Sequence, residues 1–209
     1  MKSVMLSVAL LIAAFGYSQS DKFSQAMEKN LALMDSAKTD GEYKAAADGF
    51  ERIGDAEKTQ WLPYYYAGLS LSIDGWKKDS KVDKDENSTS IKTFCDKAAA
   101  INDNSEIYAL RNMALTQQML VDPQSRWQTY GKEAGAALQK GMQLDPQNPR
   151  LYYLQGASLF NTPEQFGGGK AKAKPVLEKA IQLFDSAAPK PLNPRWGKNL
   201  TADMLAQCN

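Results

Sequence analysis

Histidine is absent from this chain of 209 residues, and cysteine occurs only twice. Without imidazole the chain has no His-based general acid or base, no Ser-His-Asp or Cys-His nucleophile system, and almost none of the usual zinc ligand sets. No paired carboxylates stand isolated in an apolar segment, as acid/base catalysis would need. We therefore predict no catalytic residues, no cofactor and no metal site.

The two cysteines, Cys95 and Cys208, allow at most one disulfide. An exported protein could hold such a bridge, but sequence does not fix the geometry that it requires. Cys95 lies on the apolar face of a predicted helix, and Cys208 is the penultimate residue. We expect one buried thiol and one thiol in the tail, with a bridge between them as the alternative.

An excess of charge of either sign is also missing, since 25 Lys and Arg residues face 24 Asp and Glu residues. A protein that grips a nucleic-acid backbone needs a basic face, and so does a polybasic protein of membrane surfaces. The balance therefore argues against nucleic-acid and membrane-surface partners. Hydrophobic residues at 43% and charged residues at 23% are a normal globular mixture.

Long apolar runs are lacking except at the N-terminus, where Lys2 precedes an apolar stretch over residues 4–15. Twelve residues are too few to span a bilayer as a helix, which needs roughly 20. One positive charge, a short apolar run and then small residues are typical of a secretory signal peptide. We predict a signal peptide over residues 1–18, cleaved before Gln19, and an exported protein that is periplasmic or, as the alternative, secreted.

The apolar spacing is helical nearly everywhere after residue 20, and strand-like alternation is absent. The segments 64–71 and 152–159 both read aromatic, three residues, Gly, two residues, Leu. A second pattern places a small or branched residue four positions before a bulkier one and seven before another small or branched one, which keeps the trio on one helix face. Its copies are Ala46/Phe50/Ile53, Ile91/Cys95/Ala98, Ala134/Leu138/Gly141 and Ala173/Leu177/Ala180.

These features resemble the tetratricopeptide repeat (TPR), a helix-turn-helix unit of about 34 residues. In that family, small residues on helix A and helix B let the two helices approach closely. The interval from one helix B to the next helix A should be constant, and it is 22 positions both from Ala46 to Gly68 and from Ala134 to Gly156. The length variation then falls in the A-to-B loops of units two, three and four. A short signal followed by Gln resembles exported proteins of Bacteroidota.

The resemblance implies an all-α, right-handed helix-turn-helix solenoid of about four TPR units, or about eight helices, over residues 19–184. The expected helices are 22–38 and 42–57, 61–73 and 89–101, 105–120 and 125–143, and 149–160 and 169–184. Residues 185–209 contain Pro189, Pro191 and Pro194 and then a short apolar helix. We expect a Pro-rich connector followed by a capping helix over 195–207, because an exposed solenoid end needs a cover.

The A helices of such a solenoid line its concave face, and successive A-to-B loops lie along one edge. Aromatic residues in those loops would make good anchors for a partner, although packing over helix ends is the alternative for each of them. The predicted partner-binding residues are Trp76, Trp127 and Phe166 on the edge, and Tyr65, Arg111, Gln117, Arg150, Tyr153 and Phe160 on the concave face.

Two other motifs give weaker evidence for a binding site. The run 167–170, Gly-Gly-Gly-Lys, opens a helix but follows no strand, and Ala171 stands where a phosphate loop has Ser or Thr. Residues 83–87 resemble the start of a calcium loop, but Phe94 stands where the loop needs Glu. We interpret the first as a helix entry and the second as a solvated loop.

The function that these expectations favour is a non-enzymatic scaffold or adaptor of the bacterial cell envelope that binds a protein or peptide of unknown identity. The alternative is an accessory ligand-binding component of a periplasmic uptake system, because proteins associated with TRAP-type transporters are similar to this chain in general plan. Fold alone does not decide between them.

Overall fold

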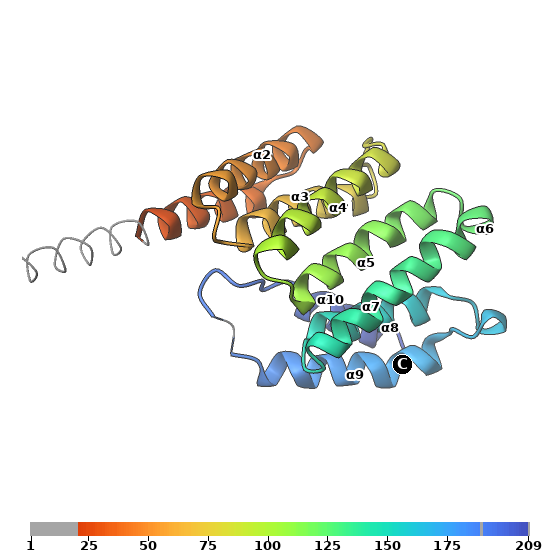
Figure 1. Ribbon diagram of the computed structural model, residues 1–209. Coiled ribbons are helices and arrows are strands. Elements are labelled where there is room, and N and C mark those ends of the chain that lie inside the picture. The colour runs from red at the N-terminus through yellow and green to blue at the C-terminus, as the bar shows by residue number, and fades with distance from the viewer. Residues whose placement is uncertain (1–20, 189, 209) are drawn as a thin grey trace, which may run out of the picture.

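The computed structural model describes residues 21–188 and 190–208, so the predicted signal peptide over 1–18 lies outside the described residues. Every regular element of the described residues is helical, which confirms the all-α prediction (Figure 1). None of these helices has the length and the apolar character that crossing a membrane requires. The elements are a helix over residues 21–36, α2 (Asp40–Glu57), α3 (Leu62–Trp76), α4 (Lys84–Ile101), α5 (Ser105–Leu120), α6 (Pro123–Arg126), the π-helical η1 (Trp127–Gly131), α7 (Lys132–Leu144), α8 (Pro149–Asn161), the 3-10 turn η2 (Glu164–Phe166), α9 (Lys170–Ser186) and α10 (Lys198–Ala206).

The long helices pack mainly on their neighbours in the chain. α2 contacts α3, α3 contacts α4, α4 contacts α5, α5 contacts α7, and α8 contacts α9. Further contacts join α3 to α5, α5 to α8 and α7 to α8 (Figure 1). This order is consistent with stacked helix pairs, while membership of the tetratricopeptide family stays a prediction.

Small residues on the helix faces allow the close approach that the sequence pattern predicted. A Cβ atom added to Gly68 of α3 would lie 2.9 Å from Leu110 Cδ2, and one added to Gly156 of α8 would lie 2.5 Å from Leu177 Cδ2. Both leucines are fully buried. A side chain at either glycine would therefore have to displace a core leucine, which explains why the recurring pattern carries Gly at these positions.

Polar side chains set where the helices begin. Thr39 and Glu42 form a reciprocal capping box before α2, in which Glu42 accepts a hydrogen bond from the Thr39 backbone N–H (2.9 Å). Asp83 accepts from two backbone N–H groups of the first turn of α4. Because Asp83 caps it, α4 begins at Lys84, earlier than the predicted residue 89, and the loop before it is correspondingly shorter.

The C-terminal part turns back over the helices. α10 packs against α9, and Lys198 forms an ion pair with Asp185 (2.7 Å). Before α10, Leu192 and Trp196 pack against the main hydrophobic core. Cys95 is buried, Cys208 is half-buried, and both are free thiols, as expected from the sequence.

One carboxyl group is buried without a hydrogen-bonding partner for one of its oxygens among the described residues. Asp74, near the end of α3, is 1% exposed and its Oδ1 has no partner. Burial first, and then the nearby carboxyl of Asp40, raise the pKa of Asp74 to about 6. Lys77 opposes this shift and Asp79 adds to it. The negative charge of Asp74 is thus unfavourable in the folded state.

We expect Asp74→Asn to stabilise the protein by roughly 1–3 kcal/mol at pH 7, because the amide carries no charge to bury. The folded protein binds more protons than the unfolded chain between the ordinary carboxyl pKa and about pH 6. The free energy of unfolding should therefore fall as pH rises through that window, and this fall should be smaller in the variant. Urea denaturation at pH 4.5, 5.5 and 7 measures the free energy of unfolding of both proteins. Parallel pH profiles for the two proteins would contradict the assignment.

Candidate functional site

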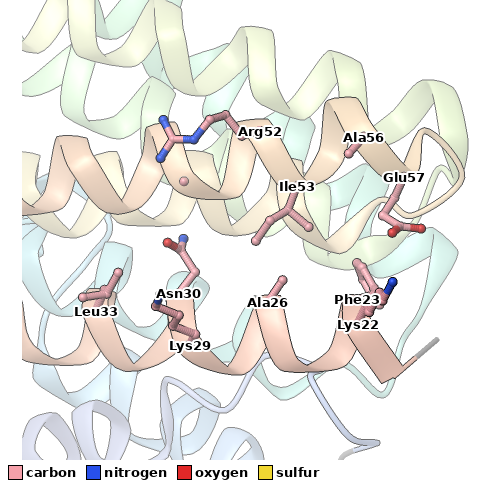
Figure 2. Close-up of a pocket in the computed structure, with 11 residues that line it drawn as sticks. Lys22, Phe23, Ala26, Lys29, Asn30, Leu33, Arg52, Ile53, Ala56 and Glu57 are labelled. Carbon is pink, nitrogen blue, oxygen red and sulfur yellow. The ribbon is translucent and has the colours of Figure 1, made fainter. Parts of the chain in front are cut away.

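A groove lies between the helix over residues 21–36 and α2, at the N-terminal end of the stack (Figure 2). Its volume is about 500 Å³, within the range of small-molecule sites. We call it the end groove. Its lining residues are Lys22, Phe23, Ala26, Lys29, Asn30, Leu33, Gly49, Arg52, Ile53, Ala56 and Glu57.

Helical spacing builds the apolar floor of the end groove. Phe23, Ala26 and Leu33 recur along one face of the first helix, and Ile53 and Ala56 recur on the facing side of α2. Figure 2 shows Ala26 and Ile53 pointing toward one another across the gap. Ala26 on the first helix and Gly49 and Ala56 on α2 are small, which leaves an apolar gap between the two helices.

Asn30 supplies the one neutral polar side chain of the lining. It is 7% exposed, and its Nδ2 donates a hydrogen bond to the Ala46 carbonyl (2.8 Å). Figure 2 shows the amide reaching toward α2. A Cβ atom added to Gly49 would lie 2.2 Å from Asn30 Oδ1. Gly49 therefore provides the space that the Asn30 amide occupies, and the two residues together define the middle of the groove.

Cations surround this apolar floor. Lys22, Lys29 and Arg52 line the end groove with Glu57 as the single acidic residue. Lys22, Lys29 and Arg52 are exposed, and the structure shows no ion pair between any of them and another described residue. The end groove can therefore take a flat apolar body while its rim attracts negative charge.

A second, smaller cleft of about 330 Å³ lies among α4, α5 and α7. It includes Arg111, one of the predicted site residues, together with Lys92, Tyr108 and Lys140. Two of its cations are already engaged, since Arg111 pairs with Asp96 (2.6 Å) and Lys92 donates to Gln118 Oε1 (2.9 Å). This cleft, which we call the middle cleft, has less room and fewer unengaged cations than the end groove.

The nine residues predicted from the sequence do not form one surface. Trp76, Trp127 and Phe166 are exposed by 44%, 55% and 75%, as expected for the loop edge. Tyr65, Gln117 and Arg150 are buried instead of displayed on a concave face. Tyr153 packs edge-on against Trp196, and Lys170 lies over the Phe160 ring at 5.7 Å. A binding role for any of the nine stays a prediction.

Two of the buried residues, Tyr65 and Arg150, belong to a polar network under the C-terminal segment, whereas Gln117 donates to the Ser72 carbonyl (2.9 Å) elsewhere. Arg150 Nη1 donates to Glu106 Oε1 (2.9 Å), Asn148 Nδ2 donates to the same oxygen (2.9 Å), and Trp196 Nε1 donates to the Tyr65 hydroxyl (2.7 Å). Burial raises the pKa of Glu106 although Arg150 opposes the shift, and burial raises the pKa of Tyr65 well above its usual range. The chain's own C-terminal segment therefore covers the part of the expected concave face that holds Tyr65, Arg150 and Tyr153.

Sequence reasoning missed the end groove because it expected ligands on the concave face. The available signal was the stripe of Phe23, Ala26 and Leu33 alongside the unmatched cations Lys22 and Lys29. The spacing of these residues is the same as that of core residues in a packed helix. The sequence alone therefore does not indicate that they line a groove. Among the described residues no cluster of acidic or cysteine side chains could hold a metal ion.

Comparison with solved structures finds the HusA haemophore from Porphyromonas gingivalis, which is 34% identical to this chain. The match covers 89% of this chain and 92% of that one, with a TM-score of 0.79. The neighbour comes from the Bacteroidota, the group that the N-terminal pattern indicated. No protein-family model and no curated protein matches the chain.

The ion pair of Arg150 with Glu106 gives a stability prediction. Arg150→Met leaves the largely enclosed Glu106 without its cation, and we expect a loss of about 3–5 kcal/mol in the free energy of unfolding at pH 7. The double variant Arg150→Met/Glu106→Gln should recover a large part of this loss, because no uncompensated charge remains. Urea denaturation of the two variants measures both. Equal stability of the single and double variants would show that the pair is not coupled.

Proposed function

The chain belongs to the same family as the HusA haemophore, and from this premise we propose that it is an extracellular binding protein whose ligand is haem and which catalyses no reaction. The observation that carries the proposal is the likeness over 89% of the chain at 34% identity. A periplasmic and a secreted location are both compatible with this proposal.

The end groove is the proposed haem site. Haem is a flat apolar macrocycle with two propionate groups on one edge, so a site for it needs an apolar slot and cations at the rim. The walls around Ala26 and Ile53 supply the slot, and Lys22, Lys29 and Arg52 supply the cations. The volume of the end groove is larger than that of the middle cleft, so the end groove is the better match for haem.

The lining offers no familiar ligand for the iron. Haem iron is commonly held by His, Cys, Met or Tyr, and none of the eleven lining residues is of these types. The chain has no His at all. Affinity would then come from the buried face of the macrocycle and from the propionates, so metal-free protoporphyrin should bind with an affinity close to that of haem.

A protein- or peptide-binding role is the second candidate function. It is favoured by the three exposed aromatic residues Trp76, Trp127 and Phe166, which lie in or beside the connections after α3, α5 and α8. These connections lie along the same side of the molecule in Figure 1. The two roles are compatible, because the aromatic edge and the end groove are different surfaces. The accessory role in a TRAP-type uptake system stays a prediction that no described feature favours.

A matched pair of substitutions tests where haem binds. Ala56 lines the end groove, Ala136 lines the middle cleft, and both are exposed positions in helices. We expect Ala56→Glu to weaken haem binding at least roughly tenfold, because it places a carboxylate beside the macrocycle and near the propionates. Ala136→Glu should leave the affinity within about twofold. Titration of the Soret absorbance measures both, and the reverse order would assign haem to the middle cleft.

A second experiment tests the chemistry of recognition. Arg52→Glu should weaken binding several-fold at low salt and much less at high salt, because screening removes the attraction between the exposed cation and a propionate. Fluorescence titration with metal-free protoporphyrin should give an affinity within a few-fold of that for haem. Failure of the unsubstituted protein to bind either tetrapyrrole would overturn the proposed function, whereas haem binding without porphyrin binding would overturn only recognition without an iron ligand.

A further inference from the structure

Residues 190–197, which we call the lid segment, lie over the polar network and touch it through three separate groups. Tyr66 donates a hydrogen bond from its hydroxyl to the Leu192 carbonyl (2.8 Å), and Arg150 donates to the Pro194 carbonyl. Trp196 donates from Nε1 to the Tyr65 hydroxyl (2.7 Å). The lid segment is therefore held by side chains of α3 and α8, far from it in the sequence.

Ring packing accompanies these bonds. The Trp196 indole meets the Tyr153 ring edge-on at 6.2 Å between centroids, and the Arg150 guanidinium lies 5.5 Å from the Trp196 ring centre. Trp196 thus fills the space between residues that the sequence assigned to the concave face. A separate ligand that took this place would have to supply an aromatic ring and an oxygen acceptor, the two groups that Trp196 and Pro194 now provide.

The lid segment has little internal structure of its own. It contains no helix, and the one backbone hydrogen bond seen within it runs from Asn193 N to the Lys190 carbonyl (3.1 Å). Lys190, Pro191 and Arg195 are exposed. Segments with few backbone hydrogen bonds open at a lower free energy than the core.

The closed arrangement also carries costs. Leu192 has a φ of 64°, in the left-handed region that a leucine seldom adopts. Arg150 Nε is buried without a hydrogen-bonding partner among the described residues, and Glu106 is nearly enclosed beside it. Opening would release Leu192 and hydrate both charged groups. Burial raises the pKa of Glu106, which agrees with an enclosed and poorly solvated carboxyl.

The far end of the lid segment offers a pivot. Gly197 has a φ of 110°, a conformation that glycine adopts without strain. Immediately after it, Lys198 pairs with Asp185 and the Thr201 hydroxyl donates to the Gly197 carbonyl (2.7 Å). α10 is therefore anchored to α9 by contacts that do not involve residues 190–196.

We propose that the lid segment is a lid that swings away from the helix stack while α10 stays on α9, uncovering a site formed by Tyr65, Glu106, Arg150 and Tyr153. The motion is a local opening of the folded protein and does not require the helices to separate. It does not rest on haem binding, since the end groove lies on another part of the molecule.

Thiol labelling of the full chain tests the lid, with Cys95 as an internal reference. Cys95 is fully buried on α4, so it reacts only when the core opens. The variant Pro194→Cys/Cys208→Ser places a thiol at a buried position of the lid segment and retains the backbone carbonyl that Arg150 contacts. We expect the introduced thiol to react with a small thiol reagent at least roughly tenfold faster than Cys95, with a rate that hardly changes in low concentrations of urea. Equal rates with equal urea dependence would overturn the proposal.

Two further measurements guard against effects of the substitutions. Trp196→Phe removes the hydrogen bond to Tyr65 but keeps a ring, and it should speed the labelling of the thiol introduced at position 194 several-fold while leaving Cys95 unchanged. Trp127→Phe, at an exposed indole elsewhere, should change neither rate. Hydrogen exchange of the unsubstituted protein should show the amides of Asn193 and Trp196 exchanging well before those of α5. If the amides of Asn193 and Trp196 exchanged at the same rate as those of α5, the lid would be ruled out.

Discussion

Close approach of neighbouring helices is the constraint on which the rest of the molecule depends. Gly68 and Gly156 lie so near Leu110 and Leu177 that no other residue fits without displacing a core side chain. The leucines are in turn fully buried, so the burial of apolar area that holds the stack together requires these glycines. These glycine–leucine contacts join helices that are close together in the chain. Close helix packing at small residues therefore recurs between α2 and α9.

The end groove lies at the N-terminal end of the stack, where the first helix packs on α2. The first helix and α2 carry apolar residues along the sides that line the groove, and among these Phe23 and Ile53 are only partly buried against the core. Cations at Lys22, Lys29 and Arg52 border these residues, which is what the proposed planar ligand with acidic groups would require. A site of this kind needs no catalytic constellation, in keeping with a chain that lacks His.

Buried charge marks the places where the fold is not optimised for stability alone. Asp74 and Glu106 are both enclosed enough for burial to raise their pKa, but Glu106 has Arg150 as an ion-pair partner, whereas Asp74 forms no ion pair among the described residues and lies near the carboxyl of Asp40. The Arg150 pair lies beneath the lid segment, where a left-handed Leu192 and an unpartnered Nε add further cost. Such concentrations of strain and unsatisfied polarity are typical of segments that move.

The helical content, the positions of most helices and the small residues between them could be predicted from the sequence, because they depend on contacts three or four residues apart or on a fixed repeat interval. The same reasoning indicated exposed aromatic residues at Trp76, Trp127 and Phe166. It did not find that Tyr65 and Arg150 are covered by residues 190–197, nor that an open groove lies beside Phe23 and Ile53. Those features were decided by the tertiary structure, since they depend on which surfaces remain uncovered once the whole chain is packed, and no local pattern of residues records what lies opposite it.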